Sequence, residues 1–163
     1  MWSSAAAMLL LGVAAGFAWE RAAHPAEWLV RPDGSIVLTE AASRDQFGVV
    51  VVFVTVGAVT SLIFGIGATL AMRELGWRLT PLIVVATLLG AVVAWQVGIE
   101  LGPVGPQDAV DPGVGDLLPS KLEIDSIAAF FVWPVFGVAG LMLAEWLSKD
   151  TAKPVEAWSA KSR

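Results

Sequence analysis

Two polar side chains, Gln96 and Glu100, lie near the end of an otherwise apolar run from Leu79 to Leu101. At four-residue spacing they share one face of a helix, and polar groups inside a membrane are costly and often functional. They form either a proton- or cation-binding site or a hydrated pair at the membrane interface. A proton path needs a chain of ionisable groups, and none continues along this run below Gln96. The sequence therefore favours the interfacial interpretation.

Few other residues offer chemistry. His24 is the only histidine and there is no cysteine, so thiolate metal sites, iron–sulfur clusters, cysteine nucleophiles and two-histidine haem ligation within the chain are excluded. Glu20 and Glu27 flank His24, but a metal site needs three or four convergent ligands, so we expect an exposed loop histidine. No phosphate-binding glycine loop, zinc-protease motif or catalytic triad is present. We expect no catalytic residues, no metal, no cofactor and no enzymatic activity.

Small residues recur at four-residue spacing on three apolar runs. Such ridges let helix backbones approach closely, where van der Waals packing drives association. Two interpretations stay open: the ridges pack within one bundle, or one of them docks a helix of another protein. The residues are Gly12 and Gly16 on the first run, Gly57, Ser61 and Gly65 on the second, and Gly90, Ala94 and Gly98 on the third.

The elements that would hold these residues are four apolar runs, at residues 2–19, 47–72, 79–101 and 124–147. Only 15% of the chain is charged, which is low for a soluble domain, and about 20 apolar residues cross a bilayer. The first run is shorter, but no basic residue precedes Arg21, so we favour a retained span over a cleaved signal peptide. The sequence predicts one integral membrane domain, an all-α bundle of four transmembrane helices.

Basic residues indicate the orientation, because Lys and Arg accumulate on the cytoplasmic side of a membrane. The loops 20–46 and 102–123 carry more acidic than basic residues, whereas the connection 73–78 and the tail 148–163 are rich in basic ones. We expect a multi-pass protein of the bacterial plasma membrane, with both termini cytoplasmic and both loops outside. The basic residues are Arg73, Arg78, Lys149, Lys153, Lys161 and Arg163.

The first outer loop has a strand pattern of its own. Residues 28–31 and 35–38 are apolar segments on either side of Pro32-Asp33-Gly34, which predicts a small extracytoplasmic β-hairpin. A lone hairpin is marginally stable in water. It should therefore rest on the helix ends, on the second outer loop or on a partner protein. The second outer loop, 102–123, is rich in Pro and Gly and shows no periodicity.

Several short motifs are spread along the chain. They are Leu11–Trp19, Asp33-Gly34, Asp45-Gln46-Phe47, Arg73-Glu74-Leu75-Gly76, Gly98–Pro103 and Val132-Trp133-Pro134. Together they resemble a family of uncharacterised small four-span membrane proteins from actinobacteria of the mycobacterial type, and the resemblance extends over nearly the whole chain. It implies a mycobacterial-type cell envelope and no particular activity.

These features favour a non-catalytic accessory subunit of a larger inner-membrane complex, and the expected bacterial setting suggests a respiratory, electron-transport assembly. The alternative is a small oligomeric transporter or channel that uses Gln96 and Glu100. A membrane enzyme is a third hypothesis, disfavoured by the missing catalytic groups. The expected partners are the lipid bilayer and other membrane subunits. A net charge of −5 argues against nucleic acid, and no soluble small-molecule substrate is predicted.

Overall fold

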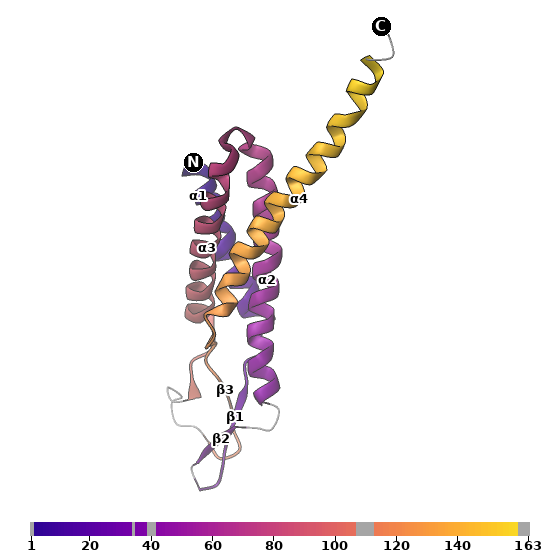
Figure 1. The fold of residues 1–163 in the computed structure, drawn as a ribbon. Coiled ribbons are helices and arrows are strands. Elements are labelled where there is room, and N and C mark those ends of the chain that lie inside the picture. Colours follow the sequence, from indigo (N-terminus) through magenta and orange to yellow (C-terminus); the bar gives the residue numbers. More distant parts are fainter. Residues whose placement is uncertain (1, 34, 39–41, 107–112, 160–163) are drawn as a thin grey trace.

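A computed structural model describes the backbone of residues 2–33, 35–38, 42–106 and 113–159, and the side chains of residues 6–33, 35–37, 42, 44–106 and 113–149 (Figure 1). The predicted turn residue Gly34, the middle of the second loop and the side chains of Lys153, Lys161 and Arg163 lie outside these ranges. The elements are the helices α1 (Trp2–Ala22), α2 (Ala42–Ala71), α3 (Leu79–Leu101) and α4 (Ala128–Ser159), the short 3₁₀ helix η1 (Arg73–Arg78), and the strands β1 (Glu27–Val30), β2 (Ile36–Leu38) and β3 (Leu117–Pro119).

Three segments of the described chain are helical, long and apolar enough to cross a membrane: Arg44–Ala71, Arg73–Leu101 and Ala128–Lys149. Only 33%, 39% and 39% of their most apolar windows are buried within the chain. The apolar side chains that remain exposed are those expected to contact lipid tails. The helices therefore fit a multi-pass membrane protein, as the composition predicts.

The helix ends differ from the ends of the apolar runs. α3 covers the same residues as its run, but α2 begins at Ala42, before Phe47, and its first turn contains Asp45. An acidic residue there interacts favourably with the helix dipole. α4 begins at Ala128 rather than Ile124 and continues past Leu147 to Ser159, into the predicted tail. Figure 1 shows this last part projecting beyond the other helices.

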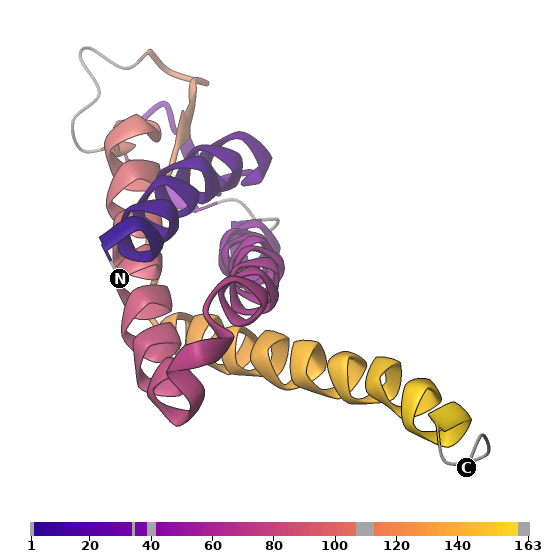
Figure 2. The ribbon, with the colours of Figure 1, turned by 90° about the horizontal axis from the view of Figure 1, so that it is seen from above.

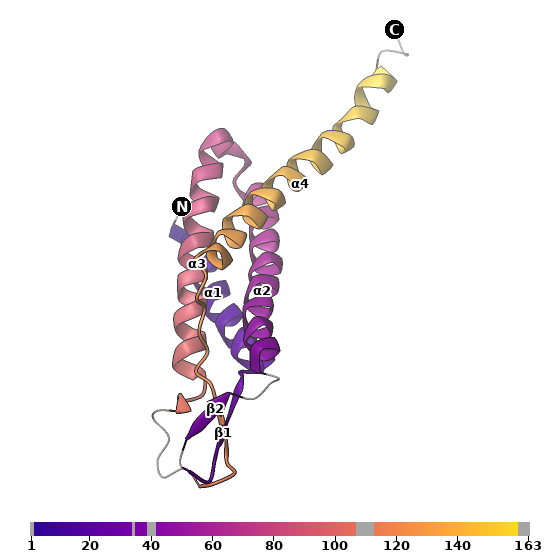
Figure 3. The ribbon, with the colours of Figure 1, turned by 60° about the horizontal axis from the view of Figure 1, so that its bottom comes forward.

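The two ends of the bundle differ in structure. At the hairpin end, η1 joins α2 to α3 in a tight antiparallel connection, and Gly76 has φ 53° within it, a conformation that glycine adopts without strain. At the sheet end, the three strands lie beyond the ends of the helices (Figure 3).

The helices pair as α1 with α3 and as α2 with α4, which are the most extensive contacts in the bundle (Figure 2). Between the pairs lies an aromatic centre in which Trp19, Phe53 and Trp133 are almost fully buried. The ring centroids of Trp19 and Phe53 are 5.1 Å apart, and those of Phe53 and Trp133 are 5.6 Å apart. Such separations are typical of attractive aromatic pairs.

The sheet contains one strand more than the sequence predicts. β1 pairs with β2 as the predicted hairpin, and β3, from the second loop, pairs antiparallel with the other edge of β1. The backbone N–H of Val30 also donates to the carbonyl oxygen of Asp116 at 3.1 Å. The predicted hairpin therefore rests on the second loop, one of the three supports expected from the sequence.

Candidate functional site

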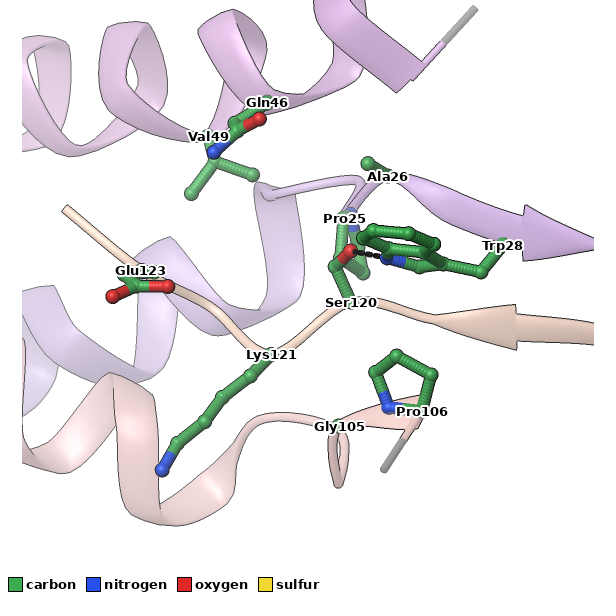
Figure 4. A pocket seen from close by; sticks show the side chains of 10 residues that line it. All are labelled: Pro25, Ala26, Trp28, Gln46, Val49, Gly105, Pro106, Ser120, Lys121 and Glu123. Carbon is green, nitrogen blue, oxygen red and sulfur yellow. Dashed lines mark hydrogen bonds between the residues drawn. The ribbon is translucent and has the colours of Figure 1, made fainter. Parts of the chain in front are cut away.

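A cavity of about 380 Å³ lies between the sheet and the sheet end of the helices. Its polar lining residues come from three parts of the chain: Trp28 from β1, Gln46 from the first turns of α2, and Ser120, Lys121 and Glu123 from the segment after β3. Figure 4 shows these side chains around the opening. The cavity thus exists only because both long loops fold against the helix ends.

Hydrogen bonds fix the wall of this cavity. The Trp28 indole N–H donates to the Ser120 hydroxyl, and the Ser120 backbone N–H donates to the Ala26 carbonyl oxygen at 2.7 Å. These bonds join β1 to the chain that leaves β3. Lys121 and Glu123 are exposed, and their side chains extend away from Trp28 (Figure 4). The rim therefore carries one cation and one anion, and the wall beside Trp28 is largely apolar.

The arrangement can bind but offers little for catalysis. The Ser120 hydroxyl accepts from the Trp28 indole N–H. The two ionisable lining side chains, Lys121 and Glu123, extend away from it in Figure 4, whereas a serine nucleophile needs an adjacent base. His24 is exposed and is not one of the lining residues. Among the residues that the structure describes, no group of three His, Cys, Asp or Glu could hold a metal ion.

Gln96 and Glu100 lie together on the exposed face of α3. They line neither this cavity nor the interior of the bundle. Gln96 is five residues from the end of α3, so it lies about 8 Å along the helix from the sheet end. Within one copy of the chain the pair cannot line a channel between the helices.

The small residues of α1 and α3 face one another. A Cβ on Gly12 would lie 2.8 Å from the Gly90 carbonyl oxygen, and one on Gly16 would lie 2.5 Å from that of Ala94. Gly90 also faces Met8, and Gly98 faces the ring of Trp19. The Trp19 indole N–H in turn donates to the Val49 carbonyl oxygen at 2.9 Å. This ridge therefore packs inside the bundle and ties α1 to both α3 and α2.

The ridge of α2 packs against α4. Gly57 lies against the Trp133 indole, Gly65 lies against the backbone of Gly137, and Ser61 is fully buried. Gly140 of α4 approaches the backbone of α2 as well. The α4 glycines complete this contact and were not among the candidates chosen from the sequence, although they also are small residues on an apolar run. The ridges are thus occupied by the chain's own helices.

The sheet carries an apolar row that the sequence did not indicate. Leu29 is directly opposite Val37 of β2 and Leu117 of β3, and residues directly opposite in an antiparallel ladder point to the same face. Trp28, the neighbour of Leu29, points to the other face, where it lines the cavity. Leu117 is 54% exposed. We call Leu29, Val37 and Leu117 the outer row.

The fold is a helical bundle, with three segments long and apolar enough to cross a membrane and a small three-stranded sheet beyond the helix ends. Comparisons of the chain with known protein families, with characterised proteins and with solved structures give no match.

Proposed function

We propose that this protein is a non-catalytic accessory subunit of a larger membrane complex in the bacterial plasma membrane. The observation that carries the proposal is the outer row. The strands lie beyond the helix ends (Figure 3), where lipid tails do not cover apolar side chains. An apolar row across all three strands of a small sheet is the kind of surface that another protein covers.

The geometry of the sheet favours a partner protein at this face. Adjacent strands are about 4.8 Å apart, so the outer row extends over roughly 10 Å. In the order β2-β1-β3, both β2 and β3 are edge strands, and an edge strand can also bind an added strand of a partner. The partner would bury Leu117 and satisfy a strand edge in the same contact.

The polar face of α3 supports a second contact inside the membrane. An exposed glutamine on a spanning helix is stabilised when a neighbouring helix accepts and donates its hydrogen bonds. Gln96 and Glu100 offer such groups on a face that the chain's own helices leave exposed. Because the small-residue ridges are occupied internally, this face is the better candidate for docking a helix of another subunit.

We further propose that α1 is a fourth span and that both termini are cytoplasmic. α1 has 21 residues, a length of about 32 Å, which is enough to cross the hydrocarbon core. Its contacts Gly12–Gly90, Gly16–Ala94 and Trp19–Gly98 run in step along α3, so the two helices share one depth. The basic residues of the η1 connection favour a cytoplasmic hairpin end.

Our proposal for the complex is a respiratory assembly, which rests on the expected bacterial setting and not on any residue. The test is purification of the tagged protein from its native membrane in mild detergent, with mass spectrometry and an absorbance spectrum. Stoichiometric subunits with haem bands support the proposal. Other stoichiometric subunits without haem retain the accessory role and exclude the respiratory one. A homo-oligomer alone refutes both and favours a pore, in which Glu100→Gln should abolish flux.

A pair of variants tests the outer row itself. Leu117→Glu should release the partner, because it places a charge in the apolar contact. Val104→Glu is the matched control, since Val104 is 70% exposed and lies outside both the helices and the outer row. Equal recovery of the partner with Leu117→Glu and with the wild type would contradict the assignment of this face.

A further inference from the structure

A second cavity, of about 490 Å³, lies at the hairpin end between α2, η1 and α4. Its polar lining consists of Thr69, Arg73, Glu145, Ser148 and Lys149. The volume falls within the range of small-molecule sites in proteins. None of these residues belongs to the cavity beneath the sheet or to the surfaces used in the proposed function.

Hydrogen bonds hold one wall of this cavity in place. The Arg73 guanidinium donates from Nη2 to the Ser148 hydroxyl at 2.7 Å, and that hydroxyl donates to the Ala144 carbonyl oxygen at 2.7 Å. These bonds fix Arg73 against α4. A guanidinium has five N–H donors in a rigid fork that matches the oxygens of a phosphate. The bond to Ser148 uses one of them and orients the rest of the group.

The charges around the cavity do not cancel. Among the described residues that line it, Arg73 and Lys149 contribute two positive charges and Glu145 one negative charge, which leaves a net charge of +1. Lys149 is four residues after Glu145, a spacing that favours an ion pair. Within the described part of the chain, however, neither cation forms an ion pair with a carboxylate. The cavity is therefore matched to a ligand with a single negative charge.

The position of the cavity is that of lipid headgroups. Trp77 is 79% exposed and adjoins the lining residue Gly76, and Trp146 is 62% exposed and adjoins Glu145. Exposed indoles of membrane proteins lie preferentially at headgroup depth. The apolar span of α2 also ends here, at Ala71, and that of α4 ends at Lys149. A ligand at this depth is reached from the lipid layer.

We infer that this cavity binds the phosphate group of an anionic phospholipid such as phosphatidylglycerol. Arg73 and Lys149 hold the phosphate oxygens, and the exposed indoles flank the headgroup. Basic pockets between transmembrane helices are known to bind anionic headgroups. The inference concerns a site separate from the outer row, so it stands or falls independently of the proposed accessory role.

The test measures lipid binding by the delipidated, purified full-length protein, using native mass spectrometry with added phosphatidylglycerol or phosphatidylcholine. Phosphatidylglycerol should bind more tightly, and Arg73→Gln should weaken its binding about tenfold, as expected for loss of a charge-assisted hydrogen bond. Arg78→Gln is the matched control, because Arg78 is an exposed residue of the same connection that does not line the cavity. It should leave the affinity essentially unchanged.

Glu145→Gln gives the sharpest result, because it should tighten binding of phosphatidylglycerol by removing the only negative charge among the described lining residues. A merely structural role of these side chains does not predict an increase. Equal binding of the two lipids, or equal effects of Arg73→Gln and Arg78→Gln, would overturn the site. Displacement of the lipid by excess inorganic phosphate would assign the cavity to free phosphate and overturn the lipid as its source.

Discussion

The indole of Trp133 lies directly on Gly57, so close that even a methyl group at position 57 would overlap the indole nitrogen. Trp133 is fully buried and lies in the aromatic centre, beside Phe53. A glycine on α2 therefore provides the space that a buried tryptophan of α4 occupies. This contact joins α2 and α4, two helices that are far apart in the sequence.

Gly57→Ala should lower the free energy of unfolding by about 1–3 kcal/mol, the usual cost of overpacking. Gly48→Ala is the control, because its added Cβ would meet no atom within 4 Å apart from its chain neighbours and its own helix backbone, and alanine favours a helix by about 0.5–1 kcal/mol over glycine. Unfolding by SDS in mixed micelles, followed by tryptophan fluorescence, measures both. Equal stability of the two variants would mean that α4 shifts freely on α2.

Ser61 provides a second stability test. Its hydroxyl is buried and has no hydrogen-bond partner among the described residues, whereas the buried Thr87 hydroxyl donates to the Ile83 carbonyl oxygen at 2.8 Å. Ser61→Ala should raise the free energy of unfolding by about 1 kcal/mol, and Thr87→Val should lower it by about 1 kcal/mol. The same micelle assay decides, and a loss of stability in Ser61→Ala would contradict the prediction.

The turn between β1 and β2 should depend on pH. The Ser35 hydroxyl and backbone N–H donate to the Asp33 carboxylate at 2.6 and 3.0 Å, which lowers the pKa of Asp33 below its ordinary value of 3.8. These bonds stabilise the charged form, so their contribution is complete above pH 3.8 and is lost as the pH falls through the lowered value. An NMR titration of Asp33 measures this, and Ser35→Ala should return the pKa toward 3.8.

The absence of cysteine makes the proposed topology easy to test, since each introduced thiol is the only one. Val114→Cys, 65% exposed at the sheet end, should react with a membrane-impermeant maleimide in intact cells. Thr80→Cys, exposed at the hairpin end, should react only after lysis. If α1 is a span, an epitope at the N-terminus should bind its antibody only after lysis, on the same side of the membrane as Thr80→Cys. If Thr80→Cys reacts in intact cells and Val114→Cys reacts only after lysis, the protein has the opposite orientation in the membrane.

The parts of the fold that follow from composition were predictable. The run from Leu79 to Leu101 is bounded by Arg78 and by Gly102-Pro103, and α3 covers the same residues. Hydropathy does not identify helix ends that lie in polar sequence. For this reason it missed the first turns of α2 and the part of α4 beyond Leu147. Ile124 is apolar yet lies outside α4, in the segment 120–126, which forms neither helix nor strand and whose Leu122 is buried in the core.

The sites depend on pairings between distant residues. β3 contains only three residues, Leu117–Pro119, in a loop rich in Pro and Gly, and no period can be recognised in so short a segment. Its partner β1 is far away in the sequence. Without β3 neither the outer row nor the cavity at the sheet end could be predicted. Residue spacing likewise indicated that Gly57 and Gly65 pack closely, but not that Trp133 and Gly137 are their partners.

The pairing of the helices has a consequence for synthesis. α1 makes its main contact with α3, and α2 makes its main contact with α4, so no helix is most extensively packed against its immediate neighbour in the chain. In the proposed four-span topology, α1 and α2 enter the membrane before either has its principal partner. α2 keeps its glycine face open until α4 leaves the ribosome. In that topology, the insertion machinery has to hold or shield α1 until α3 has been made and α2 until α4 has been made.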